Sequence, residues 1–306
     1  MKLIIPGGSG FLGLYLAEYF SKKGWEIVIL TRGAKAPQGN IRYVHWDGKT
    51  IGPWADELDG ADAVVNMAGR TVNCRYTDKN KAEILNSRLD STKVLGEAIA
   101  KAANPPKIWI NSSSATYYKD TRGSLPANDE YNGQTGSDFS MGVCQAWEKQ
   151  FNESATPANV RKIALRSTIV LGKQGGAMEP ILGLVKKFAG GAQGPGTQYI
   201  SWVHVHDFAR IVDFLIERTD ITGAINCAAP NPELNRDFMS KLRKACKVPF
   251  GLPMPEWMLR MGAVLIQTET ELILKSRKVV SKRLEEAGFN FDYPTVEKAF
   301  EEIVSR

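Results

Sequence analysis

Short apolar runs alternate with segments of helical periodicity over the first 172 residues. The apolar runs have the length of one buried strand and fall within residues 2–5, 26–30, 41–45, 62–66, 107–111 and 162–166. Between them, apolar side chains recur at spacings of three and four, most clearly over residues 11–20, 78–102 and 138–154. Alternating strands and helices build a parallel sheet with right-handed crossovers and helices on both faces. We therefore expect an α/β protein with a doubly wound parallel sheet.

The pattern changes after Gly172, where glycine pairs and a Gly-Pro-Gly segment interrupt the chain. The elements expected beyond this point are a helix near 180–189, a strand over 200–203, a helix over 207–217, a strand over 223–227, and a helix to Cys246 with Asn235 as its cap. We expect two units: residues 1–172, with 200–228 returning to them, and a smaller, mostly helical lobe made of residues 173–199 and 229–306.

The first strand ends at a glycine-rich turn that leads directly into a helix. Two glycine spacings overlap here, because Gly8, Gly10 and Gly13 give G-x-G-x-x-G, while Gly7, Gly10 and Gly13 give G-x-x-G-x-x-G. A strand, a glycine turn and a helix in this order cradle a dinucleotide pyrophosphate at the helix N-terminus, as in Rossmann-like folds. The alternative is a glycine turn with a purely structural role.

The residues that end the second strand indicate which cofactor is bound. A protein that prefers NAD carries an Asp or Glu here, about 20 residues past the turn, to bind the ribose 2′-hydroxyl. This chain has Thr31 and Arg32 instead, with Lys35 close behind. The planar, cationic guanidinium suits a 2′-phosphate, so NADP(H) is favoured over NAD(H). A solvated loop cation is the alternative interpretation of Arg32.

Small and polar residues follow two later strands. Met67, Ala68 and Gly69 come after the fourth strand, where small side chains let a cofactor approach the backbone. The polar and aromatic cluster 112–118 follows the fifth strand. Ligands of doubly wound sheets bind at the carboxyl ends of the strands, which makes this cluster a candidate reaction site, although a polar turn explains the same residues.

Composition excludes several classes of partner. The net charge is +6, but the basic residues are scattered among acids without a basic stripe, so we expect no nucleic acid. The cysteines lie far apart without a C-x-x-C pair, which argues against zinc and fits free thiols. His204 and His206 alternate as strand neighbours would, yet two histidines are a weak signal, and we expect no metal. Without a leader or a membrane-length apolar run, we expect a soluble cytoplasmic protein that contacts no membrane.

Together these segments resemble the extended short-chain dehydrogenase/reductase superfamily, of the NAD-dependent epimerase/dehydratase type. More narrowly, the chain is similar to an atypical branch of it that carries a small C-terminal domain of unknown function. The resemblance spans essentially the whole chain in one order. Its motifs lie at 7–13, 31–32, 66–69, 83–88, 117–118, 147–148, 166–172, 175–178, 201–207, 229–232 and 287–291.

The resemblance implies a Rossmann-like sheet with NADP(H) along its carboxyl edge and a small-molecule substrate beside it. It implies that Ser9, Gly10, Phe11 and Leu12 bind pyrophosphate and that Arg32 binds the 2′-phosphate. The remaining implied contacts are Met67 and Ala68 at the adenosine half, Glu83 and Arg88 facing the cofactor, and Val170 near the nicotinamide. The superfamily often forms homodimers through its two long helices, so a homodimer is possible here.

One departure from the superfamily concerns the reaction itself. Typical members carry Y-x-x-x-K followed by a Glu, in which the Tyr transfers a proton and the Lys lowers its pKa. Alignment on Glu148 places Ser140 and Cys144 at these two positions. A serine hydroxyl is too weak an acid, and a thiol brings no fixed positive charge. Ser114 still matches the catalytic Ser/Thr of the superfamily.

Two hypotheses follow from the missing dyad. In the first, the protein is an oxidoreductase that acts on a small carbonyl or sugar-like compound, with Tyr117 or Tyr118 beside Ser114 as the substitute acid and Lys119 lowering its pKa. In the second, the protein binds NADP(H) without turnover, as a sensor or interaction module. Cys144 as a nucleophile is the weaker alternative to a buried thiol, since no base stands beside it in the sequence.

Overall fold

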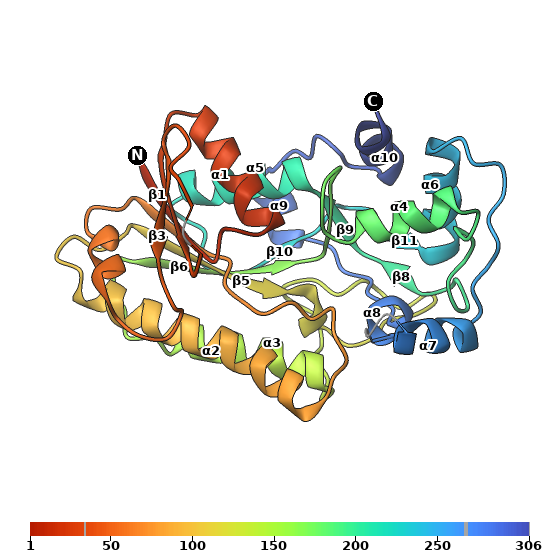
Figure 1. Cartoon of the computed structure of the whole chain (residues 1–306), viewed down its shortest axis with the longest axis horizontal. Coiled ribbons are helices and arrows are strands. Elements are labelled where there is room, and N and C mark those ends of the chain that lie inside the picture. Colours follow the sequence, from red (N-terminus) through yellow and green to blue (C-terminus); the bar gives the residue numbers. More distant parts are fainter. Residues whose placement is uncertain (34, 266–268, 306) are drawn as a thin grey trace.

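Seven parallel strands form the central sheet of the computed structural model, which describes residues 1–33, 35–265 and 269–305 (Figure 1). Their order across the sheet is β10-β6-β5-β4-β1-β2-β3. Their bounds are β1 Lys2–Pro6, β2 Glu26–Thr31, β3 Ile41–His45, β4 Ala63–Asn66, β5 Ile108–Ser114, β6 Arg161–Ser167 and β10 Gly223–Cys227. The strand order reverses at β1, as in doubly wound sheets, so the fold class predicted from the alternating pattern is confirmed.

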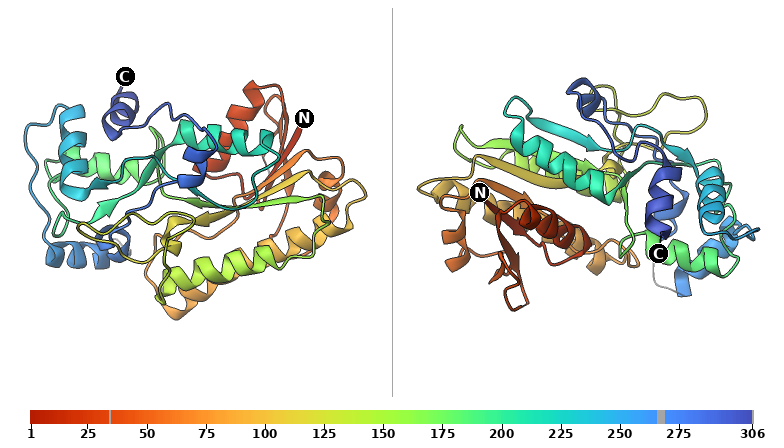
Figure 2. Two further views of the ribbon diagram at one scale, coloured as in Figure 1. Left: turned by 180° about the vertical axis from the view of Figure 1, so that it is seen from behind. Right: turned by 90° about the horizontal axis from the view of Figure 1, so that it is seen from above.

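Helices cover both faces of this sheet (Figures 1 and 2). The long helices α2 (Asp78–Lys101) and α3 (Phe139–Asn152) lie side by side on one face, with the short 3-10 helix η1 (Pro53–Leu58) near them. On the other face, α1 (Phe11–Lys22) packs against α5 (Val205–Glu217). Each face therefore has its own apolar core, one around Phe20 and Phe208 and the other around Trp109 and Phe151.

The remaining elements form the part of the molecule to the right in Figure 1. Two small sheets pair β7 (Ile169–Leu171) with β9 (Trp202–His204), and β8 (Tyr199–Ile200) with β11 (Glu233–Leu234). The helices here are α4 (Met178–Lys186), α6 (Asn235–Ala245), α7 (Glu256–Leu265), α8 (Glu271–Leu274) and α10 (Val296–Val304). The short helix α9 (Lys282–Glu286) lies instead against β10 of the central sheet. A third apolar cluster joins α4, α6 and α10 around Phe238 and Phe300. Across the described residues, every helix is too short or too polar to cross a lipid bilayer.

Two local predictions were wrong. The single strand expected over 200–203 is divided at Ser201, because β8 and β9 pair with different partners and the Ser201 side chain binds neighbouring backbone instead. Asn235 is the first residue of α6 and Leu234 precedes it as the cap. The Asn235 side chain is used elsewhere, since it accepts a hydrogen bond from the backbone N–H of Gln193 at 2.8 Å.

Candidate functional site

The glycine turn after β1 is packed too tightly for larger residues at two of its positions. Gly7 has φ of +72°, and a Cβ there would lie 2.5 Å from the backbone of Ala68. A Cβ on Gly13 would lie 2.3 Å from the Cα of Gly8, so glycine lets α1 pack directly on the turn. Both glycines therefore set how closely α1 and the loop after β4 approach β1.

The N-terminus of α1 is open toward solvent. Its capping residue is Gly10, which has no side chain, and the first turn contains no acidic residue. A Cβ on Gly10 would meet no atom within 4 Å, so the space in front of the helix is free. The first amides of a helix carry unpaired N–H groups and the positive end of its dipole, which makes this end a site for an anion.

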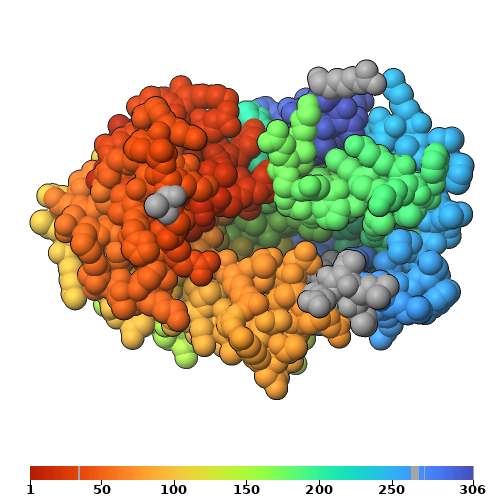
Figure 3. All heavy atoms as spheres, in the orientation of Figure 1, coloured from red at the N-terminus to blue at the C-terminus, as the bar shows by residue number. Residues whose placement is uncertain are grey.

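A cavity of about 870 Å³ extends from this helix end along the carboxyl edge of the sheet. In Figure 3 the surface is hollowed between the red and orange N-terminal residues and the green segment near residue 180. The cavity is lined by residues after β1, β2, β3 and β4 and by α2. Eight of the predicted cofactor residues line it: Gly7, Ser9, Gly10, Thr31, Arg32, Ala68, Gly69 and Glu83.

The other predicted cofactor residues are not part of the lining of this cavity. Phe11 packs beneath Gly172, Gly175 and Gly176, and Leu12 packs on the apolar core next to it. The Met67 sulfur accepts a hydrogen bond from Ser112 at 3.1 Å. Val170 is buried in β7, and Gly13 is buried against Gly8. Direct contact of these side chains with a cofactor remains a prediction.

The cations around the cavity differ in how they are paired. Arg32 is exposed, and no described residue forms an ion pair or hydrogen bond with its guanidinium. Arg70 pairs with Glu83, so Glu83 is already neutralised within the protein. Arg88 donates to the carbonyls of Arg70 and Ile84 at 3.1 and 2.9 Å. Burial lowers the pKa of Arg88, whose guanidinium lies 5.1 Å from the centre of the Trp147 ring.

Ser114 ends β5 and begins the 3-10 helix η2 (Ala115–Tyr117). Its hydroxyl accepts the backbone N–H of Thr116 at 3.1 Å and lies 3.0 Å from the Thr116 hydroxyl. The half-buried ring of Tyr117 packs against the Arg166 guanidinium, which lies 3.7 Å from the ring centre. No described residue forms a hydrogen bond with the Tyr117 hydroxyl. This hydroxyl is therefore free to meet a ligand.

Tyr118 has a different environment from Tyr117. It is 2% exposed, and its hydroxyl donates to Asn226 Oδ1 at 2.9 Å and accepts from Arg166 Nη1 at 2.8 Å. Burial raises the pKa of Tyr118. Because its hydroxyl is buried and already occupied, Tyr118 is placed to support the site rather than to donate a proton in it.

The lysine next to these tyrosines binds another side chain. The Lys119 ammonium donates to Gln134, and the pKa of Tyr118 is raised instead of lowered. Adjacency in sequence was misleading, because the chain leaves η2 in an extended conformation and the next side chain points elsewhere. The suggestion that Lys119 lowers the pKa of a tyrosine is therefore wrong for Tyr118.

The positions of the missing dyad lie one turn apart on α3. The Ser140 hydroxyl donates to Glu271, a residue of the C-terminal part of the chain. Cys144 is buried, and this burial raises the pKa of its thiol to about 12. A thiol that stays protonated is a poor nucleophile, so the structure favours the buried-thiol interpretation of Cys144.

The cavity also contains residues that the sequence did not single out. Trp46, Asp47, Arg70 and Asn86 line it, although Asp47 is engaged with the backbone of Lys49 and Thr50. Trp46 and Asp47 directly follow β3, and a search at the carboxyl end of every strand would have found them.

The two histidines do not form the strand pair considered above. His204 accepts the backbone N–H of His206 at 3.2 Å and thereby caps α5, so the two residues lie on different elements. Within the described residues, no group of three or more His, Cys, Asp or Glu side chains is arranged to hold a metal ion.

Comparison with known proteins identifies the family. Residues 3–228 match the model of the NAD dependent epimerase/dehydratase family, and residues 254–303 match DUF1731, a domain of unknown function. Epimerase family protein YfhF of Bacillus subtilis is 30% identical over 307 residues, which cover 100% of this chain and 98% of that protein.

Solved structures show the same relationship. The crystal structure of human epimerase family protein SDR39U1 with NADPH is 29% identical, covers 99% of each chain and has a TM-score of 0.87. UDP-N-acetylglucosamine 4-epimerase from Bacillus cereus is 20% identical with a TM-score of 0.74, and this likeness shows the fold alone. The chain belongs to the NAD dependent epimerase/dehydratase family and carries a C-terminal DUF1731 domain.

Proposed function

We propose that this protein binds NADP(H) and transfers hydride to or from a small carbonyl or sugar-like compound. One observation carries the cofactor assignment: the guanidinium of Arg32, which no described residue pairs with, lines the same cavity as the uncapped N-terminus of α1. Two anionic groups of one dinucleotide, the pyrophosphate and the 2′-phosphate, fit these two positive sites. The NADPH in the human relative's structure supports this assignment.

We assign the remaining cofactor contacts from the resemblance to the family and from the residues that line the cavity. We assign the pyrophosphate to the turn at Ser9–Leu12 and the 2′-phosphate to Thr31 and Arg32. The adenosine half is assigned to Met67, Ala68 and Gly69, and Glu83, Arg88 and Val170 are assigned to the neighbouring walls. Bound NADP(H) supplies the hydride chemistry, whereas this chain binds and orients the reactants.

Tyr117 is our candidate for the acid–base residue. Its hydroxyl is unoccupied by the described residues, and it follows the carboxyl end of β5, where ligands of doubly wound sheets bind. Ser114, at the end of the same strand, is the candidate for orienting the substrate oxygen. Arg166 packs on the Tyr117 ring and thereby fixes its position. Tyr118 is left out of the catalytic set because its hydroxyl is buried and bonded.

A specific observation favours a second function, which is binding of NADP(H) without turnover. Ser140 and Cys144 stand at the usual positions of the Tyr and Lys, and the Cys144 thiol is buried with its pKa raised to about 12. Such a protein would sense the cofactor through the C-terminal lobe, which contacts Ser140 by way of Glu271.

The quaternary structure and the location of the protein belong to the same proposal. The long helices α2 and α3 lie together on one face of the sheet (Figure 2), where they offer a surface for a homodimer. The four cysteines are free thiols, which agrees with a reducing cytoplasm. We retain the division into residues 1–172 with 200–228, and a substrate lobe of 173–199 with 229–306.

Oxidation of NADPH in the presence of a panel of aldehydes, ketones and keto sugars tests the catalytic proposal. We expect turnover of at least one compound and a loss of about hundredfold or more in Tyr117→Phe. Tyr131→Phe is the matched control, because this tyrosine is 58% exposed and its hydroxyl binds Glu286. Tight binding of NADPH without turnover of any compound would instead favour the sensor.

A further inference from the structure

A half-buried arginine of the C-terminal domain has no side-chain partner among the described residues. Arg277 lies in the DUF1731 region, and its guanidinium forms no ion pair or hydrogen bond with any described residue. Only part of its side chain remains accessible, and burial lowers its pKa. Withdrawing a charge from water without a partner costs free energy, and a ligand of opposite charge would offset this cost.

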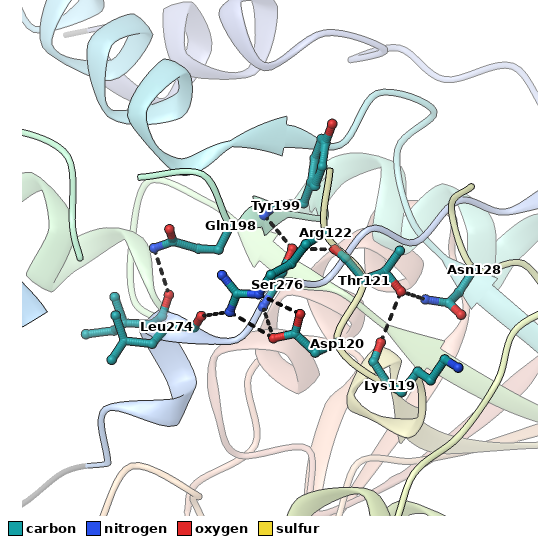
Figure 4. Close-up of polar contacts among 10 residues, drawn as sticks. Lys119, Asp120, Thr121, Arg122, Asn128, Gln198, Tyr199, Leu274 and Ser276 are labelled. Carbon is teal, nitrogen blue, oxygen red and sulfur yellow. Dashed lines mark hydrogen bonds and ion pairs between the residues drawn. The ribbon is translucent and has the colours of Figure 1, made fainter. Parts of the chain in front are cut away.

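The backbone that carries Arg277 is held firmly on both sides. Ser276 is fully buried; it accepts from Tyr199 N–H at 2.8 Å and donates from its hydroxyl to the Thr121 carbonyl at 2.5 Å (Figure 4). Its own N–H donates to Asp120 Oδ2 at 3.1 Å. The Arg277 N–H donates to the Tyr199 carbonyl at 2.9 Å, and Ser201 donates to the Arg277 carbonyl at 2.7 Å. Arg277 is therefore presented from a rigid segment.

This segment delivers Arg277 to the carboxyl edge of the sheet. Its electrostatic neighbours are Glu271 in α8, Cys144 in the first half of α3, Asp138 just before α3, and Tyr76 just before α2. The helices α2 and α3 are followed by β5 and β6, which begin at the amino edge of the parallel sheet. The N-terminal ends of both helices therefore lie at the carboxyl edge, together with Ser114 and Tyr117. Arg88 lies near the same edge of the sheet, because Cys144 and Tyr76 are its electrostatic neighbours as well.

The carboxylates near Arg277 form ion pairs and hydrogen bonds with other side chains. Asp138 pairs with Lys275 at 2.5 Å, and Glu271 accepts from Ser140 and lies 3.3 Å from Lys275. Arg166 and Glu148 neutralise each other in their own ion pair. Lys275 is therefore the ion-pair partner of both carboxylates, and neither forms an ion pair with Arg277 within the described residues.

We infer that Arg277 binds the carboxylate of an acidic substrate, so that the compound that reacts beside Tyr117 is an oxo acid or a uronic-type sugar. A single planar guanidinium matches a carboxylate in a bidentate pair. A carboxylate brings one negative charge to this one guanidinium, whereas a sugar nucleotide would bring the two charges of a diphosphate. The inference rests on the proposed function and specifies its substrate class.

Matched pairs of acids and their methyl esters test this inference, since esterification removes the charge and keeps the carbonyl. The pairs are succinate semialdehyde, 4-carboxybenzaldehyde and glucuronate, each with its methyl ester, titrated into the full chain saturated with NADP⁺. We expect at least one acid to bind tenfold or more tightly than its ester. Arg277→Gln should remove this preference, and Arg277→Lys should retain part of it.

Lys278→Gln is the matched control, because it removes the same charge one residue away, where the ammonium binds the Leu125 carbonyl. It should leave the preference unchanged, and all variants should keep the NADP⁺ affinity of the wild type. If NADP⁺ binds but no acid is preferred over its ester, or if the preference persists in Arg277→Gln, the inference is overturned. Tighter binding of UDP-glucose than of every acid, insensitive to Arg277→Gln, would overturn it too. Failure of the wild type to bind NADP⁺ would instead remove the proposed function, and this inference with it.

Discussion

The guanidinium of Arg166 and the carboxylate of Glu148 form a bidentate ion pair inside the protein. Nε lies 2.8 Å from Oε1 and Nη2 lies 2.7 Å from Oε2, and Ser113 donates a further hydrogen bond to Glu148 at 2.6 Å. Burial by itself would lower the pKa of Arg166, but the hydrogen bonds and charge of Glu148 raise it above its ordinary value. The pair connects α3 with β6 directly beneath Tyr117.

Removal of one member of this pair should destabilise the fold. Glu148→Gln keeps the shape of the side chain but leaves the Arg166 charge without compensation. We expect a loss of about 3 kcal/mol in the free energy of unfolding, measured by denaturant titration. Glu153→Gln is the control, because its pair with Lys149 at 3.9 Å is exposed, and it should change the value by less than about 0.5 kcal/mol. Equal effects of the two variants would contradict the structural role of the buried pair.

The adjacent tyrosines should separate stability from activity. Tyr118→Phe leaves Asn226 and one N–H of Arg166 without a partner, so we expect a loss of about 1–3 kcal/mol in the free energy of unfolding. Tyr117→Phe removes a hydroxyl that no described residue binds, so its stability should stay within about 0.5 kcal/mol of the wild type. Thermal and denaturant unfolding of both variants measures the contrast. A larger loss for Tyr117→Phe would show that the two environments are assigned the wrong way round.

Replacement of two helical glycines by alanine should change the stability of the fold in opposite directions. The Cβ of Gly13→Ala in α1 would lie 2.3 Å from the Cα of Gly8, so the helix must move away from the turn. We expect loss of stability together with weaker NADPH binding. The matched variant Gly142→Ala in α3 meets nothing within 4 Å and should stabilise the helix by up to about 1 kcal/mol. Calorimetry of unfolding distinguishes them, and a neutral Gly13→Ala would refute the close packing of α1 on the turn.

The thiol of Cys144 should be inert in the folded protein. Its pKa of about 12 leaves roughly one thiol in ten thousand ionised at pH 8, because the thiolate fraction falls tenfold per unit below the pKa. We expect iodoacetamide to alkylate the partly exposed Cys74 first and to leave Cys144 unmodified until the protein unfolds. Peptide mapping by mass spectrometry follows both sites. Equal labelling rates in the native protein would revive Cys144 as a nucleophile.

The sequence predicted the sheet and the glycine turn well because both depend on local signals. Buried strands such as β1 and β2 contain continuous apolar runs, and the requirement for glycine next to Ala68 and Gly8 appears in the sequence as a fixed spacing. The roles of Tyr117 and Tyr118 could not be separated in this way. Both are tyrosines at the end of one strand, and only the packing of Arg166 and Asn226 decides which hydroxyl is buried.

Arg277 was missed for a related reason. In the sequence it is an ordinary cation between a serine and a lysine, far from every motif. Its placement depends on hydrogen bonds from Ser276 and Ser201 to segments more than 70 residues away in the chain. Long-range contacts of this kind leave no periodic pattern, so neither spacing nor composition could have shown them.

The cofactor assignment depends most directly on the pairing of Arg32 with a 2′-phosphate. Calorimetric titration of the cofactor-free protein with NADPH and NADH should show NADPH binding at least tenfold more tightly, a difference of about 1.4 kcal/mol. Arg32→Ala should remove this difference, while Lys35→Ala, which removes a neighbouring cation that lies against Tyr43, should retain it. If NADH binds as tightly as NADPH, or neither binds at millimolar concentration, the cofactor assignment is wrong, and the proposed function fails with it.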